Sequence, residues 1–140
     1  MFTSVVPAWN SANLHRLAAK ISSSLVFAHV RAAYPGMPVS EENCHPFQAG
    51  RYMFMHNGGI AGFVQIRRKL LETLSDECYN RVESFHSDSA VCFAVFMHQL
   101  GCAKQPRTPN HLRLVMERTI ETIVAVQVST LPSLDHHSRT

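Results

Sequence analysis

The stretch that decides the fold runs from Asn43 to Gly59 and reads NCHPFQAGRYMFMHNGG. Within it, residues 51–56 alternate between two faces, which predicts a strand, and Asn57 follows with two glycines after it. Backbone can approach a ligand closely at such glycines, and N–H groups left unpaired there can stabilise an oxyanion. Asn-Gly after an alternating apolar run is also typical of a hairpin turn, so the stretch alone leaves both interpretations open.

The residues before this stretch predict one helix and one strand. Helical spacing of apolar residues predicts a helix over 11–22. Its apolar face is expected to comprise Leu14, Leu17, Ala18 and Ile21. The continuous apolar run 25–30 predicts a strand covered on both faces, which delivers Arg31 at its end. A charged residue at that position either contacts a ligand or reaches solvent. Two prolines predict an irregular loop over 34–38.

The residues after this stretch predict three helices. The first covers 60–74, with Arg67-Arg68-Lys69 on its solvated face. The second is a buried helix over 91–100. The third covers 112–124 and follows a proline-containing linker. Either Ser87 or Asp88 is expected to cap the buried helix, and residues 75–85 form a surface connection. The stripes of the two amphipathic helices are expected to comprise Ile60, Phe63, Val64, Leu70, Leu71 and Leu74, and Leu112, Val115, Met116, Ile120, Ile123 and Val124. Two strands alone make an unstable sheet, so either the sequence pattern fails to reveal further strands or the chain lacks them.

Composition limits the function classes. A chain of 140 residues with a net charge of +3 suits one domain, and its basic residues are too dispersed for a nucleic-acid surface. No apolar run approaches the ~18 residues of a membrane span, and no secretory signal is expected. The four cysteines lack CxxC spacing, which favours a reducing, cytoplasmic setting. The nine histidines show no zinc signature, so neither a metal nor a cofactor is expected.

Four motifs together resemble a known family. They are HVRAA at 29–33, ENCHPF at 42–47, FMHNGGI at 54–60 and HSDSA at 86–90. In their order and spacing they resemble the motifs of class II glutamine amidotransferases, over about Pro7 to Leu100. The second and third motifs resemble the branch that acts on γ-glutamyl compounds in glutathione degradation and ergothioneine synthesis. The resemblance implies an α+β chain, a partial N-terminal nucleophile sandwich with antiparallel strands packed against helices.

The resemblance also implies roles for particular residues. In the family, an N-terminal cysteine attacks the γ-carbonyl of glutamine or of a γ-glutamyl compound such as glutathione. The side-chain amide of Asn57 and the N–H of Gly58 match the oxyanion hole. Arg31 matches the residue that pairs with the substrate α-carboxylate, and Asp88 matches the one that holds its α-ammonium. His45 falls on the pocket histidine.

Two departures from the family pattern limit this assignment. The chain opens with MFT at residues 1–3 where the family needs cysteine after the initiator methionine, and no cysteine precedes Cys44. The nucleophile is therefore expected to be absent, and the opening strands with it. Ala90 replaces a glutamate, which removes a capping-box contact. We expect a truncated amidotransferase domain over 1–128, close to inactive, and a flexible tail over 129–140.

Two other functions remain open at this stage. One is a non-catalytic module that binds a small γ-glutamyl molecule or works beside a peptidase partner subunit. The other is a nonfunctional fragment, in which the missing strands would leave sheet edges and apolar faces exposed.

Overall fold

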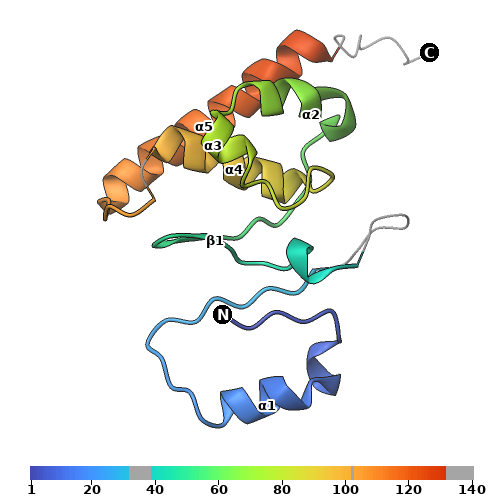
Figure 1. The fold of residues 1–140 in the computed structure, drawn as a ribbon, viewed down its shortest axis with the longest axis vertical. Helices are drawn as coiled ribbons and strands as arrows, with labels where there is room; N and C mark the ends of the chain where they lie inside the picture. The colour runs from blue at the N-terminus through green and yellow to red at the C-terminus, as the bar shows by residue number, and fades with distance from the viewer. Residues whose placement is uncertain (32–38, 102, 132–140) are drawn as a thin grey trace, which may run out of the picture.

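The computed structural model describes residues 1–31, 39–101 and 103–131. Its elements, in chain order, are η1 Ala8–Asn10, α1 Ala12–Ala18, η2 Glu41–Asn43, β1 Phe47–Ala49, β2 Tyr52–Phe54, α2 Phe63–Glu72, α3 Asp76–Tyr79, α4 Asp88–Leu100 and α5 Pro109–Thr130. Figure 1 shows three tiers, with α2–α5 at one end, the hairpin in the middle and α1 at the other end. The expected α+β class is confirmed, with one two-stranded antiparallel sheet in the described ranges.

Helix α4 is the centre of the core. Nine of its 13 residues are buried, because α2, α3, α5 and β1 all contact it. Ile66 and Leu70 of α2 and Val115 of α5 fill the space around it and are almost completely buried. The expected buried helix is thus confirmed. It begins at Asp88, where Ser87 caps it.

The hairpin places aromatic rings against α4. β1 and β2 pair antiparallel, with Phe47 opposite Phe54. The two rings lie on one face of the hairpin and stack on Phe93, at centroid distances of 6.0 and 5.5 Å. The predicted strand over 51–56 is therefore present as β2, although it is shorter. Its partner β1 precedes it in the chain.

The hairpin turn lies at Gly50 and Arg51. Gly50 has φ of 57°, and a Cβ there would lie 2.6 Å from the carbonyl oxygen of Ala103, so glycine is required. The N–H of Arg51 donates to the same oxygen at 3.3 Å. The hairpin-turn interpretation of Asn57-Gly58 is therefore wrong, and that pair lies beyond the end of β2.

The expected strand over 25–30 is wrong. The segment is extended, but it forms no ladder with any described residue. Leu25, Val26 and Val30 are 71%, 72% and 88% exposed. An apolar run is buried on both faces only where neighbouring strands and layers cover it, and within the described ranges none does so. The run keeps its extended conformation without burial.

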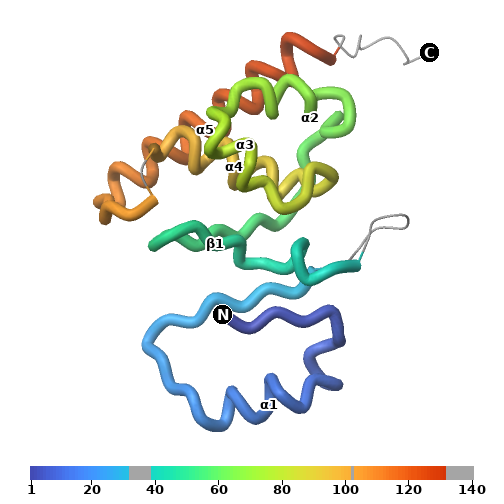
Figure 2. Tube along the Cα trace, viewed as in Figure 1, coloured from blue at the N-terminus to red at the C-terminus, as the bar shows by residue number. Residues whose placement is uncertain are grey.

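Helix α1 is shorter than expected and buries none of its residues. The predicted apolar face fails because Leu17 and Ile21 are exposed, and Figure 2 shows the chain around α1 as a wide loop beyond the hairpin. Helical spacing gave the correct element here. It did not predict the environment, because none of the described elements packs on that face closely enough to bury it.

The amphipathic stripes of α2 and α5 are narrower than expected. Val64, Ile120 and Val124 were predicted to face the core and are exposed, whereas Thr119 of α5 is fully buried. The hydroxyl of Thr119 donates to the carbonyl oxygen of Val115 at 2.8 Å, which satisfies its polar group inside the helix.

Other expectations meet the limits of the description. The connection expected over 75–85 contains the short helix α3, capped by Ser75. The loop expected at 34–38, and 132–140 of the expected tail, lie outside the described residues. None of the described helices is long and apolar enough to cross a membrane.

Candidate functional site

His45 lies at the centre of a cluster between the hairpin and the N-terminal residues. Its side chain is only 8% exposed, and its ring lies 4.1 Å from that of His29 and 4.7 Å from that of Phe47. Both ring nitrogens are buried, and neither has a hydrogen-bond partner among the residues that the structure describes. Buried polar atoms are normally paired, so two unpaired nitrogens on one imidazole indicate a place where a ligand can bind.

Charged groups surround this imidazole. The pKa of His45 is lowered from 6.5 to about 4, first by burial, because a charged ring is poorly solvated there, and then by electrostatic interactions with His29, His56 and Arg31. The carboxylate of Asp88 acts in the opposite direction. Arg31 and Asp88 are thus each within electrostatic reach of His45.

Asp88 is half-buried in the first turn of α4. Its Oδ2 accepts the N–H of Ile60 at 2.9 Å, and its Oδ1 accepts the N–H of Ser89 at 2.7 Å. The Ser89 hydroxyl also donates to Oδ1, at 3.3 Å. A carboxylate offers about four acceptor positions, so one on Oδ2 is left for a ligand.

The turn after β2 carries two hydrogen-bond donors. Asn57, Gly58 and Gly59 are exposed, and Gly58 has φ of 133°, which side chains rarely adopt. Across the described ranges, neither the side-chain amide of Asn57 nor the N–H of Gly58 has a hydrogen-bond partner. Unpaired donors are one condition of an oxyanion hole, and the assignment of that role to these two residues stays a prediction.

Sequence reasoning missed His29 and Ser89. His29 donates from Nε2 to the carbonyl oxygen of His56 at 3.1 Å, and Nδ1 of His56 lies 2.8 Å from Oγ of Ser89. His56 itself is half-buried and hydrogen-bonded. A signal for His29 was available, because residues two apart on an extended segment share a face and His29 precedes Arg31 by two.

Two further predicted residues can be placed. Arg31 is half-buried at the end of the extended segment, where its charge reaches His45. Cys44, although adjacent to His45, directs its thiol to the carbonyl oxygens of Ser4 and Ser40, at 3.6 and 3.8 Å. It therefore has no contact with the described cluster that would make it a nucleophile.

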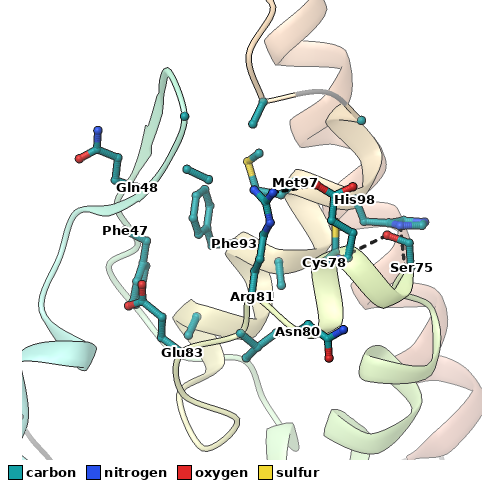
Figure 3. A pocket seen from close by; sticks show the side chains of 18 of the residues that line it. Phe47, Gln48, Ser75, Cys78, Asn80, Arg81, Glu83, Phe93, Met97 and His98 are labelled. Atoms are coloured by element: carbon teal, nitrogen blue, oxygen red, sulfur yellow. Dashed lines mark hydrogen bonds and ion pairs between the residues drawn. The ribbon is translucent and has the colours of Figure 1, made fainter.

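A separate groove of about 1040 Å³ lies between the hairpin and helices α3 and α4. Figure 3 shows Phe47 and Phe93 on one side of it and Arg81 and Met97 on another. It is lined by none of the predicted site residues. Among the residues that the structure describes, no group of three or more His, Cys, Asp or Glu side chains could hold a metal ion.

Comparison with known families and proteins gives a consistent result. The model of the class II glutamine amidotransferases matches residues 1–127. The chain is 49% identical over 130 residues to DUG3, a probable glutamine amidotransferase of Saccharomyces cerevisiae, covering 88% of this chain and 36% of that protein.

Two other relatives match shorter parts of the chain. A glutamine–fructose-6-phosphate aminotransferase of Gluconobacter oxydans is 34% identical over 79 residues, covering 56% of this chain and 12% of that protein. A γ-glutamyl-hercynylcysteine sulfoxide hydrolase of Mycobacterium tuberculosis is 34% identical over 57 residues, covering 41% of this chain and 24% of that protein. The chain therefore spans about a third or less of the length of these curated relatives. No solved structure matches it.

Proposed function

The chain belongs to the class II glutamine amidotransferases, and from this premise we propose that it binds a γ-glutamyl group at the site around His45. The ligand is glutamine or a γ-glutamyl compound such as glutathione, and the family reaction hydrolyses its γ-amide. The observation that carries the proposal is the joint action of Arg31 and Asp88 on a buried His45 whose ring nitrogens are unpaired.

The amino-acid end of the ligand is recognised by charge. The planar guanidinium of Arg31 suits a bidentate contact with the α-carboxylate. The acceptor position left on Oδ2 of Asp88 suits the α-ammonium. His45 is neutral near pH 7 and can donate from one ring nitrogen and accept at the other, so it can bind the ligand without repelling its ammonium group.

The γ-carbonyl end meets the turn after β2. The side-chain amide of Asn57 and the N–H of Gly58 can both donate to the oxygen that becomes negative when the carbonyl is attacked. Donors of this kind each stabilise the transition state by roughly 3 to 4 kcal/mol. Because neither donor has a hydrogen-bond partner in the described part of the chain, neither must break a hydrogen bond there to serve this purpose.

Hydrolysis further requires a cysteine thiolate at the γ-carbonyl. In the family reaction it forms a γ-glutamyl thioester, the amine leaves with a proton, and water then releases glutamate. No cysteine precedes Cys44 in these 140 residues, and the Cys44 thiol faces two backbone carbonyls. Removing a nucleophile costs on the order of a millionfold in other hydrolases, so we expect this polypeptide to bind without measurable turnover.

A second candidate is a γ-glutamyl-binding module without catalysis, which works beside a peptidase subunit. It is supported by Arg31, His45 and Asp88, which offer recognition by charge and hydrogen bonding without a nucleophile of their own. A reducing, cytoplasmic setting belongs to either proposal and is supported by the unpaired cysteines Cys44, Cys78 and Cys92.

Calorimetry on the 140-residue chain tests the binding proposal. We expect heats with L-glutamine, L-glutamate and glutathione, and none with glutarate, which keeps both carboxylates but lacks the α-ammonium. A folded protein that gives no heat with any L-compound would contradict the proposed function. Release of glutamate from glutamine by the same polypeptide would contradict the expectation that it lacks a nucleophile.

A further inference from the structure

The turn Asn57-Gly58-Gly59 is fastened at both ends to consecutive residues of α4. Before the turn, Nδ1 of His56 lies 2.8 Å from Oγ of Ser89. After the turn, the N–H of Ile60 donates to Oδ2 of Asp88 at 2.9 Å. The first turn of one buried helix therefore holds both ends of the segment that carries the oxyanion donors.

The two anchors are linked through one hydroxyl. Ser89 donates its single hydroxyl proton to Oδ1 of Asp88, at 3.3 Å. Its oxygen can then only accept from His56, which must carry its proton on Nδ1. Nε2 of the same ring faces Gly58, since a Cβ built on that glycine would lie 3.7 Å from it.

A third contact comes from the N-terminal residues. Nε2 of His29 donates to the carbonyl oxygen of His56 at 3.1 Å, which fixes the peptide group directly before Asn57. The turn itself supplies no rigidity, because two of its three residues are glycines and all three are exposed. Its geometry must come from these neighbours.

We propose that Ser89 and His56 are positioning residues that hold the Asn57 amide and the Gly58 N–H in the orientation an oxyanion needs. They touch no reacting atom themselves. The proposal rests on the proposed function for the purpose of the turn. The anchoring is a property of the ligand-free chain and can be measured without any ligand.

The test compares Ser89→Ala with Ser87→Ala, because Ser87 is the N-cap of α4 and its hydroxyl, among the described residues, accepts the N–H of Ala90 and contacts neither end of the turn. In the unmodified chain, nitrogen NMR should find the neutral His56 ring protonated on Nδ1. Ser89→Ala should remove that tautomer preference and lower the backbone order parameters of residues 57–59 toward the flexible range below about 0.6. Ser87→Ala should leave both unchanged.

The same variants have an expected effect on affinity. Ser89→Ala should weaken L-glutamate binding about three- to tenfold, the usual consequence of losing one hydrogen bond. A second pair of variants, at His56, separates a loss of anchoring from a loss of folding. His56→Phe removes the nitrogen and should behave as Ser89→Ala does, whereas His56→Asn keeps a donor near the Nδ1 position and should restore the order of the turn.

The proposal is overturned if Ser89→Ala and His56→Phe, both folded, leave residues 57–59 as ordered as in the unmodified chain. It is equally overturned if the His56 proton lies on Nε2. Failure of the unmodified chain to bind L-glutamate would contradict the proposed function instead, and the tautomer and order measurements would still decide the anchoring.

Discussion

The helical body, residues 63–131, and the N-terminal arm, residues 1–31, differ in how they are held. The body surrounds α4 with buried apolar side chains from α2 and α5, whereas Ser11 is the one residue of the arm that is buried. Figure 1 shows the arm looping away from the body at the far side of the hairpin. One part is stabilised by packing and the other by a few specific contacts.

The proposed site is assembled from both regions. Asp88 and Ser89 belong to the rigid start of α4, while His29 and Arg31 come from the arm. The arm reaches the site through the tilted contact of the His29 ring with the His45 ring and the hydrogen bond from His29 to the His56 carbonyl oxygen. Changes in the body should therefore alter stability, and changes in the arm should alter the site with little effect on stability.

The largest expected effect separates the two regions directly. Ile66→Ala in the body should lower the free energy of unfolding by about 2–5 kcal/mol, because it leaves a cavity in a fully buried position. Leu25→Ala in the arm should change it by less than about 0.5 kcal/mol. Urea titrations followed by circular dichroism measure both. Equal losses would mean that the arm is packed as tightly as the body.

The next effect concerns the boundary between the regions, at His45. The unfolded chain takes up a proton on this residue below pH 6.5, whereas the folded chain resists it until about pH 4. Stability is therefore complete above pH 6.5 and falls as the pH drops toward 4, by about 3 kcal/mol in total. Urea unfolding at several pH values should show a shallower fall in His45→Phe. An identical pH dependence in both proteins would rule out a depressed pKa at His45.

Matched helix caps give a smaller effect. Ser87 accepts the N–H of Ala90 at the start of α4, and Ser11 accepts the N–H of Leu14 at the start of α1, both at 3.3 Å. Ser87→Ala should cost about 1 kcal/mol of global stability. Ser11→Ala should cost almost none, because α1 is not part of the packed core. Thermal melts of both variants test this, and a larger loss at Ser11 would reverse the comparison.

The smallest effect on stability comes with a change in solution behaviour. Val26→Ser removes an exposed apolar side chain from the extended arm, so we expect unchanged stability and less self-association. Val64→Ser removes an equally exposed but isolated valine from α2 and should alter neither the stability nor the self-association of the protein. Light scattering at increasing protein concentration makes the measurement. Unchanged scattering in Val26→Ser would show that the exposed apolar residues of the arm do not promote self-association.

The sequence predicted the body better than the arm. The spacing of α2, α4 and α5, and the Ser87 cap, follow from local periodicity and capping chemistry that the chain itself supplies. The strand over 25–30 and the buried face of α1 failed because burial depends on what covers an element. The sequence of an apolar run does not reveal whether another layer of the structure packs against it.

The site residues were predicted through motifs and only in part through physics, and their roles stay predictions. Arg31 and Asp88 both act electrostatically on His45, and Asn57-Gly58 lies outside the hairpin turn, which was one of its two open interpretations. Gly50-Arg51 was not recognised as the turn, because the close approach of the Ala103 carbonyl that requires glycine there involves a residue far along the chain. The roles of His29 and Ser89 depend on long-range hydrogen bonds, which spacing along the chain does not encode.

The central claim is that a γ-glutamyl ligand binds where the arm meets the body. An NMR titration of the 140-residue chain with L-glutamate tests it most directly, since each amide reports its own surroundings. We predict shifts at Arg31, His45, Asn57, Gly58 and Ile60, and no shifts at groove residues such as Arg81 and Met97. Shifts confined to the groove, or none at saturating L-glutamate, would contradict the account.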